Sequence, residues 1–391
     1  MPSGVRITLP LMIFVIIATV FYCPVMVVAE TLEGQFQSEL EKLRDEYKFP
    51  GGTAAYILPN GTLGTAATGY SDVEAGTPMR PESRMLAASI GKTFVGATVV
   101  SLAQEGKLGL DDLISKYLED RPWFSRLPNH DTITVRHLLR HNAGVPNHLG
   151  TESFAKAFSE SWRDPRVSFA PERLIEFVLD EPALFEPGEG WEYTDTSYIL
   201  LGLIIEEVSE YTFYDEVIYR FIVPLRMNLT SPSDRVILPG LAAGYLPADN
   251  KSGLPEKTTI TEGILVWNPG GEWTGGGLVS NPRDLVVFAK ALFEGRAMNG
   301  PYLKELLSSV KAGPPEKPNV RYGAGVGIYV DDYYGTTYGH GGSMPGYTSS
   351  MRYYTEHGIA VSFQVNVDSS QIGDDYYEIE RRLAALFMNL E

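Results

Sequence analysis

Cysteine is almost absent from this chain of 391 residues, since Cys23 is the only one. It lies inside a strongly apolar stretch near the N-terminus. A chain with one thiol forms no internal disulfide and no zinc site built on several cysteine ligands. Its stability must therefore come from a hydrophobic core, which a chain of this length can bury.

Basic side chains are also scarce, with 32 Lys and Arg against 49 Asp and Glu and a formal net charge of −17. Such a surface repels the phosphates of nucleic acids and the headgroups of anionic membranes, so we expect neither as a partner. Apolar residues make up 44% and charged residues 21%, which is an ordinary globular composition.

Charge is nearly missing from the first 29 residues, where Arg6 is the only charged side chain and residues 7–28 are almost wholly apolar. This pattern, ending at the small residue Ala29, predicts a signal peptide over residues 1–29. We therefore expect an exported protein, periplasmic or secreted, with a single catalytic domain over residues 30–391. The apolar run is long enough that an uncleaved membrane anchor is the alternative.

Residues 31–48 have apolar side chains at helical spacing, and two strand-like runs follow at 52–58 and 62–70. Asn60-Gly61 between these two runs is a strong hairpin signal. Mainly helical segments occupy the middle of the chain: 89–105, 132–141, 171–179, 198–210, 213–224 and 282–293. Short β-rich runs and a closing helix follow at 322–330, 336–340, 347–354, 359–367 and 372–390.

Strands at both ends with helices between them predict an α+β fold, in which one antiparallel sheet is built from both chain ends. Helices flank this sheet, and a mainly helical lobe is inserted. We place the sheet lobe at about 30–85 and 270–391 and the helical lobe at about 86–269.

Ser89 and Lys92 stand three residues apart at the start of a long apolar run, so in a helix they share one face. A serine needs a nearby base to act as a nucleophile, and a helix N-terminus favours the negative charge that develops in acyl transfer. The same spacing occurs at Ser153…Lys156 and Ser308…Lys311, which we interpret as surface helix positions. The spacing alone does not choose among the three.

Two later motifs favour the first pair. Tyr193-Thr194-Asp195 lies between a Pro-Gly turn and an apolar helix, and His340-Gly341-Gly342-Ser343 lies on a strand near the C-terminus. Taken in order, these motifs resemble those of the penicillin-recognising serine hydrolases: class C-type β-lactamases, D-Ala-D-Ala carboxypeptidases and related esterases. Their pattern is Ser-x-x-Lys, Tyr-x-Asn, then Lys-Thr-Gly or His-x-Gly. The resemblance covers nearly the whole chain after residue 29 and implies a β-lactamase/transpeptidase-like fold.

The resemblance implies a role for each motif. Ser89 would be the acylated nucleophile, Lys92 would assist removal of its proton, and Tyr193 would be general base and proton relay to the leaving group. His340 would line the site from its strand, and Gly342 would let that strand approach the substrate closely. The backbone N–H groups of Ser89 and Ser343 would form the oxyanion hole.

Asp195 departs from the pattern, because the family usually has Asn there. A carboxylate favours a charged Lys92, which would in turn stabilise a Tyr193 phenolate as the base. Asp also lacks the N–H donor that an Asn offers to a substrate amide, so the departure bears on substrate recognition more than on nucleophilic catalysis.

Other chemistries have weaker support. His137 and His141 are spaced for zinc on a helix face, but the sequence lacks the glutamate of a metalloprotease. Gly275–Gly277 is not followed by the residues of a phosphate loop, and Gly-x-Ser-x-Gly does not occur. We therefore expect no cofactor and no metal. The remaining histidines have no partner pattern and are expected to be solvated: His130, His148 and His357.

The leading hypothesis is an exported serine hydrolase that forms an acyl-enzyme on Ser89 and acts on D-Ala-D-Ala-like peptides or β-lactams. Its partner would be a small molecule or peptide, such as a peptidoglycan-type peptide. One alternative is a carboxylesterase of the same family acting on small acyl esters, which the Asp195 departure suits. Another is a penicillin-binding sensor that is acylated without turnover.

Overall fold

The computed structural model describes residues 1, 3–4, 31–313, 319–373 and 376–388. The described part from Leu32 onward belongs to one compact unit. The predicted signal peptide lies almost entirely outside the described residues, so it stays a prediction. Among the helices that the structure describes, none is both long and apolar enough to cross a membrane.

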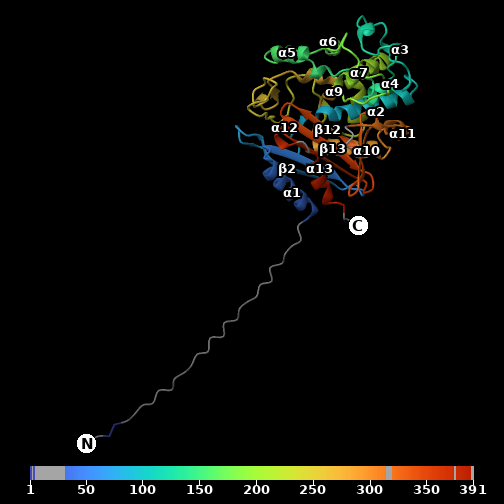
Figure 1. The fold of residues 1–391 in the computed structure, drawn as a ribbon. Helices are drawn as coiled ribbons and strands as arrows, with labels where there is room; N and C mark the ends of the chain where they lie inside the picture. Colours follow the sequence, from blue (N-terminus) through green and yellow to red (C-terminus); the bar gives the residue numbers. More distant parts are fainter. Residues whose placement is uncertain (2, 5–30, 314–318, 374–375, 389–391) are drawn as a thin grey trace. The chain divides into compact units, whose positions relative to one another are not determined.

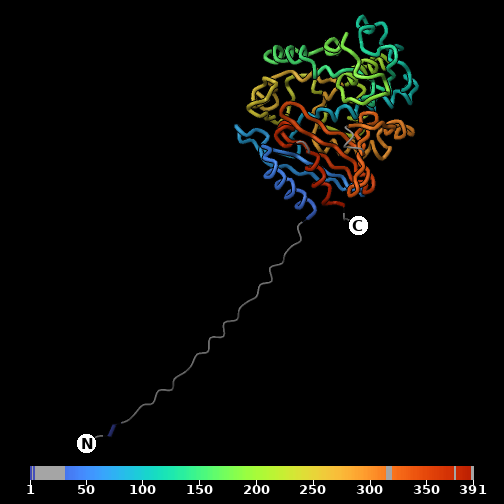
Figure 2. The backbone as a smooth tube through the Cα atoms, viewed as in Figure 1, coloured from blue at the N-terminus to red at the C-terminus, as the bar shows by residue number. Residues whose placement is uncertain are grey.

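A nine-stranded antiparallel sheet forms the centre of the molecule, in the order β3-β2-β1-β14-β13-β12-β11-β10-β9. Strand β1 near the N-terminus pairs with β14 near the C-terminus, which confirms that both chain ends build the sheet. Figure 2 shows this as blue and red segments side by side. The strands are β1 Gly51–Ile57, β2 Leu63–Asp72, β3 Thr77–Pro78, β9 Val310–Lys311, β10 Val320–Tyr322, β11 Gly327–Asp331, β12 Gly335–Met344, β13 Tyr347–Tyr354 and β14 Ile359–Val365.

The β1–β2 hairpin follows from its turn residues. The Asn60 side chain accepts a hydrogen bond from the Thr62 N–H at 2.9 Å, and Gly61 has a φ of 86°, which suits glycine. Side chains of β1 alternate between the two faces of the sheet: Tyr56 packs in one apolar cluster and Ala55 in another.

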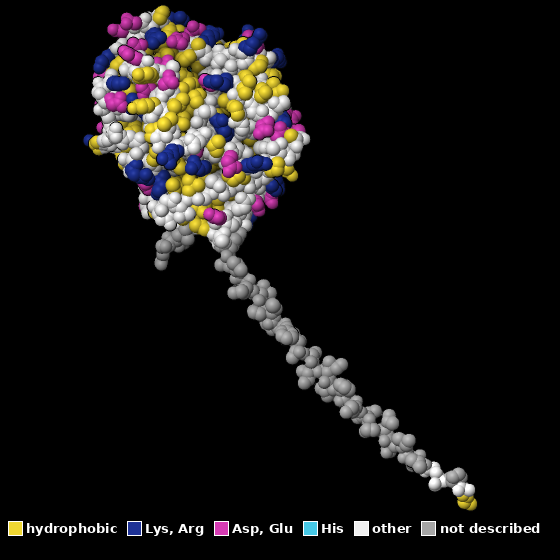
Figure 3. Space-filling model, turned by 180° about the vertical axis from the view of Figure 1, so that it is seen from behind, with side chains coloured by type: hydrophobic (Ala, Val, Ile, Leu, Met, Phe, Trp, Pro, Cys, Tyr) yellow, Lys and Arg dark blue, Asp and Glu magenta, His cyan; other side chains and the backbone are white. Residues whose placement is uncertain are grey.

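One face of the sheet is covered by α1 (Leu32–Tyr47) and α13 (Tyr377–Ala385), and α10 (Pro282–Phe293) packs on β1, β13 and β14 from the other side (Figure 1). Helix α1 buries Phe36, Leu40 and Leu43, which confirms the predicted apolar face. Basic and acidic side chains lie among one another on the face seen in Figure 3, so the net negative charge is not gathered there.

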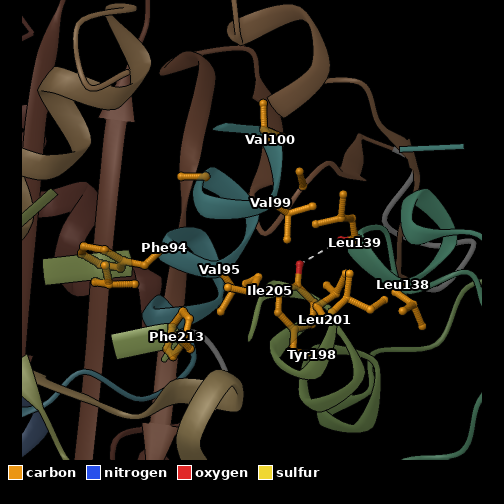
Figure 4. Close-up of a cluster of buried hydrophobic side chains, with 14 of the residues drawn as sticks. Phe94, Val95, Val99, Val100, Leu138, Leu139, Tyr198, Leu201, Ile205 and Phe213 are labelled. Atoms are coloured by element: carbon orange, nitrogen blue, oxygen red, sulfur yellow. Dashed lines mark hydrogen bonds between the residues drawn. The ribbon is translucent and has the colours of Figure 1, made fainter. Parts of the chain in front are cut away.

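Helices α2 (Gly91–Gln104) and α7 (Asp195–Ser209) are mostly buried and pack against each other, and the predicted division into a sheet lobe and a helical lobe stays a prediction. Figure 4 shows Val95 and Val99 of α2 facing Leu201 and Ile205 of α7, and the Tyr198 hydroxyl donates to the Leu139 carbonyl at 2.8 Å.

The remaining helices are α3 Ser115–Leu118, α4 Val135–Leu139, α5 Glu152–Ser161, α6 Pro171–Glu176, α8 Phe213–Val217, α9 Trp273–Gly276, α11 Leu303–Leu306 and α12 Ser369–Ile372. Single turns of other helix types are η1 Ala88–Ile90, η2 Phe124–Arg126, η3 His148–Gly150, η4 Ile218–Ile222 and η5 Pro269–Glu272, and short strands are β4 Met85–Leu86, β5 Ser231–Pro232, β6 Thr259–Thr261, β7 Ile264–Leu265 and β8 Leu278–Ser280.

Three elements near the C-terminus begin or end at residues other than those predicted. The expected strand 322–330 is divided into β10 and β11 by a turn at Gly325, where φ is 69° and a Cβ atom would lie 2.1 Å from the Lys92 carbonyl oxygen. Strand β12 runs beyond residue 340 to Met344. The expected helix 372–390 is shorter, because α12 ends at Ile372 and α13 covers Tyr377–Ala385.

Candidate active site

Ser89 lies in the tight turn η1, which leads directly into α2. The preceding residue, Ala88, has a φ of 50°, an uncommon conformation for a residue with a side chain. Two glycines pack closely on this turn: a Cβ atom on Gly276 would lie 2.6 Å from the Ala88 carbonyl carbon, and one on Gly342 would lie 2.3 Å from the Ala87 oxygen. The fold therefore holds the Ser89 turn between α9 and β12.

Lys92 is fully buried, and its ammonium group has three acceptors. The Nζ atom lies 3.1 Å from Ser89 Oγ, 2.5 Å from Asp195 Oδ1 and 2.6 Å from the Gly275 carbonyl oxygen. The Asp195 carboxylate and the Gly275 carbonyl can only accept hydrogen bonds, whereas the Ser89 hydroxyl can also donate. The contact with the carboxylate favours the charged form of Lys92, in which the lysine donates to Ser89.

Tyr193 and Asp195 flank the N-terminus of α7, and Lys92 Nζ lies 4.9 Å from the centre of the Tyr193 ring. Within the described part of the chain, the buried Tyr193 hydroxyl has no hydrogen-bond partner. Burial and the negative charge of Asp195 raise the pKa of Tyr193 well above its usual range, and the nearby Ser89 hydroxyl, which makes no well-aligned hydrogen bond to it, opposes this only in part. The expected phenolate is thus unsupported, because burial first and then the charge of Asp195 favour the neutral phenol.

His340 lies on β12 and is buried, 7% exposed. Its Nδ1 lies 2.5 Å from the Gly341 carbonyl oxygen, so Nδ1 is the donor, and the Tyr322 hydroxyl lies 2.8 Å from Nε2. Burial, with the nearby Lys92 charge, lowers the pKa of His340 to about 3. The histidine on this strand is therefore neutral at ordinary pH.

The last part of β12 lies against the nucleophile turn. Strand β11 pairs with β12 only up to Gly339, so from His340 to Met344 the sheet partner is β13 alone. On β13, Ser349 donates to the Ala87 carbonyl oxygen at 2.9 Å, which ties the sheet to the turn. The Ser343 side chain is exposed, and its Oγ lies 2.7 Å from Ser369 Oγ. The structure thus brings all three sequence motifs together.

The other two Ser-x-x-Lys pairs lie elsewhere. Ser153 and Lys156 are exposed on α5, as predicted. Ser308 follows α11, where its hydroxyl bonds Arg140, and Lys311 lies on β9, so the expectation of a surface helix is wrong for this pair.

Three residues near the site were not predicted to be there. His148 is 3% exposed with Nδ1 lying 3.0 Å from Thr196 Oγ1, so the expectation that it is solvated is wrong. Glu272 lines a small aromatic pocket with Asp195, and burial together with the Asp195 charge raises the pKa of Glu272 to about 7. His141 is fully buried against the Tyr193 ring, with centroids 4.3 Å apart. The surroundings of these three side chains depend on residues from distant segments, which the sequence alone does not bring together.

The predicted alternative of a zinc site finds no support in side-chain grouping. His137 Nδ1 accepts the Thr134 N–H at 3.2 Å as part of a helix cap. Across the described ranges, no three His, Cys, Asp or Glu side chains are grouped so that they could hold a metal ion.

Comparison with known proteins shows which family has this architecture. The family model described as Beta-lactamase matches residues 36–385, nearly the whole chain. The chain belongs to the Beta-lactamase family. It is therefore a serine hydrolase related to the penicillin-binding proteins, as the motifs predicted.

Proteins similar to this chain include a penicillin-binding protein and a D-amino acid amidase. Penicillin-binding protein 4* of Bacillus subtilis (strain 168) is 26% identical over 329 residues, or 82% of this chain and 69% of that protein. Protein flp of Staphylococcus aureus (strain NCTC 8325 / PS 47) is 30% identical, but the match covers 46% of this chain and only 34% of that protein. A solved D-amino acid amidase from Ochrobactrum anthropi SV3 is 26% identical with a TM-score of 0.76, covering 92% of this chain and 99% of that one.

Proposed function

We propose that this protein hydrolyses amide or ester bonds through an acyl-enzyme on Ser89, with peptides ending in D-amino acids, such as D-Ala-D-Ala, or β-lactams as substrates. The observation that carries the proposal is the chain of contacts from Ser89 Oγ through Lys92 Nζ to Asp195, beside the buried Tyr193 hydroxyl, which has no hydrogen-bond partner among the described residues. Similarity to a penicillin-binding protein and to a D-amino acid amidase supports the same substrate class.

A neutral tyrosine accounts for the proton transfers. Ser89 Oγ bonds to the substrate carbonyl carbon while its proton passes to the Tyr193 oxygen, and the original Tyr193 proton passes to the leaving nitrogen or oxygen as that bond breaks. In deacylation a water molecule repeats the sequence, giving its proton to Tyr193 while Tyr193 returns one to Ser89. Lys92 keeps its charge throughout and stabilises the developing negative charge on Ser89 Oγ.

The oxyanion formed on the carbonyl would be held by the backbone N–H groups of Ser89 and Ser343. The packing of Gly342 on Ala87 supports this role, because it holds β12 beside the nucleophile turn. His340, which is neutral, would shape the β12 side of the site without contributing charge.

A small-ester carboxylesterase is the second candidate. Asp195 already accepts a hydrogen bond from Lys92 and, unlike an asparagine, has no N–H to offer a substrate amide. An ester needs no such donor. We also propose that the protein is exported, on the strength of the apolar N-terminal stretch.

Labelling with a fluorophosphonate tests the assignment of Ser89. We expect one equivalent to attach to the wild-type protein, none to Ser89→Ala, and a full equivalent to the control Ser153→Ala, whose serine has the same spacing to a lysine. Labelling that persists in Ser89→Ala would overturn the nucleophile.

A turnover panel then separates the substrates. We expect hydrolysis of a D-Ala-D-Ala peptide or a chromogenic cephalosporin. Turnover of a p-nitrophenyl ester alone would favour the esterase, and stoichiometric labelling by penicillin without turnover of any of the three would indicate a sensor.

A further inference from the structure

His141 contacts the Tyr193 segment at three points. Its carbonyl oxygen accepts the Glu192 N–H at 3.0 Å, and its ring Nδ1 accepts the Thr194 N–H at 3.3 Å. Its imidazole packs on the ring of Tyr193 itself, with centroids 4.3 Å apart. One residue therefore holds the backbone on both sides of the tyrosine and the tyrosine ring between them.

The backbone conformation of His141 makes these contacts possible. Its φ is 59°, in the left-handed region that a residue with a side chain adopts only at an energetic cost. Such strain persists only where surrounding contacts determine it. Here the left-handed turn ends α4 and lets the His141 carbonyl and ring both face residues 192–194.

The imidazole also has a fixed proton arrangement. Because Nδ1 is an acceptor, the proton of the neutral ring lies on Nε2. That Nε2 is buried and, among the residues described, has no hydrogen-bond partner. The ring lies among the aromatic rings of Tyr198 and Tyr322, with centroids 5.0 and 4.7 Å away. Burial first, and then the charge of Lys92, lowers the pKa of His141 well below its usual range, so Nδ1 keeps its lone pair for Thr194.

We propose that His141 is a positioning residue for Tyr193: by accepting the Thr194 N–H it fixes where the tyrosine hydroxyl lies beside Ser89. This inference rests on the proposed role of Tyr193. Among the described residues, neither ring nitrogen of His141 makes a hydrogen bond to Ser89, so His141 acts through the tyrosine. A misplacement of about 1 Å in such a group costs on the order of 100-fold in rate.

Substitutions at position 141 separate positioning from general packing. His141→Asn suits a positive φ and keeps an acceptor at the δ1 position, whereas His141→Phe keeps a ring and loses the acceptor. We expect His141→Phe to slow Ser89 labelling by a fluorophosphonate by about 10- to 100-fold and His141→Asn to stay within about threefold of wild type. Equal losses in the two variants would overturn the proposal.

A double-mutant cycle with Tyr193→Phe supplies the second readout. If His141 acts through the tyrosine, His141→Phe has no further effect on labelling once Tyr193 is replaced; independent, multiplied losses would contradict this. If Tyr193→Phe labels slowly but His141→Phe labels at the wild-type rate, only the positioning role of His141 is overturned. If Tyr193→Phe itself labels at the wild-type rate, the proposed proton relay through Tyr193 is overturned as well.

The thermal midpoint of each variant is measured alongside. His141→Gly, which accepts a positive φ without strain, replaces the phenylalanine variant if that one does not fold, with the same expected loss. His130→Phe serves as the matched control, since His130 is a partly buried histidine packed on Phe124. It should label at the wild-type rate.

Discussion

Two of the buried ion pairs in the described part of the chain differ in how completely they are hydrogen-bonded. Arg352 of β13 and Glu380 of α13 are 5% and 0% exposed, with 2.7 Å between Nε and Oε1. Glu380 also accepts from the hydroxyls of Ser350 and Tyr354. The guanidinium lies over the ring of Tyr329, 4.2 Å from its centre.

The pair of Lys92 and Asp195 is buried to a similar degree, yet several polar groups around it lack hydrogen-bond partners among the described residues. The Tyr193 hydroxyl, His141 Nε2 and Trp191 Nε1 are buried close by and, within the described ranges, make no hydrogen bond. Unpaired buried polar groups are costly, and proteins retain them where a ligand or a reaction uses them. Burial of a charge pair is therefore not informative by itself. Unpaired buried groups also occur elsewhere in the described part of the chain, such as Trp123 Nε1 and Gln364 Oε1, and the site differs in having several of them beside a charge pair.

Replacing the site lysine should have the largest effect. In Lys92→Met the positive charge beside Ser89 is lost, and we expect labelling by a fluorophosphonate to slow by about 10²- to 10⁴-fold. The double variant Lys92→Met/Asp195→Asn should recover stability, because no unpaired charge remains, but not labelling. Recovery of labelling in the double variant would show that Lys92 is only structural, like Arg352.

Replacing the arginine of the other pair should affect stability instead. Arg352→Met leaves Glu380 buried without its partner, so we expect the free energy of unfolding to fall by about 3–5 kcal/mol in denaturant titrations. Ser89 labelling per folded molecule should stay at the wild-type value. A slower labelling rate at full folding would link this pair to the site and remove the contrast.

The smallest expected effect concerns Glu272, which lines the pocket beside Asp195. Its pKa is raised from an ordinary 4.5 to about 7, so the folded protein binds its proton more tightly than the unfolded chain. This group therefore lowers stability as pH rises from about 4.5 to 7, and the loss persists above pH 7. Glu272→Gln should gain stability relative to wild type between pH 5 and pH 8, by about 2–3 kcal/mol. A constant difference in unfolding free energy across that range would contradict the raised pKa.

Local signals in the sequence predicted much of the fold. The Asn60-Gly61 turn, the apolar face of α1 and the Thr134 cap of α4 depend on a few neighbouring residues, and all are present. The order of motifs also predicted that Ser89, Tyr193 and His340 lie near one another. Such features can be predicted from the sequence because residue spacing and turn chemistry act within one segment.

What could not be predicted depends on contacts between distant segments. The division of the strand at Gly325 arises from its approach to the Lys92 carbonyl. The burial of His148 and the raised pKa values of Tyr193 and Glu272 depend on what surrounds each side chain in space. The raised pKa of Tyr193 does not favour the expected phenolate. Its main cause is burial, which depends on packing that the sequence does not show, and the charge of Asp195 adds to it.

The pairing of β1 with β14 has a consequence for biosynthesis. On the ribosome the β1–β2 hairpin emerges first, but its free edge has no partner until residues 359–365 have been made. Pairings over such long sequence separations form slowly, and an open strand edge invites association with other chains. Nascent chains of this protein should therefore depend on a chaperone until synthesis is nearly complete, and C-terminal truncations that remove β14 should aggregate.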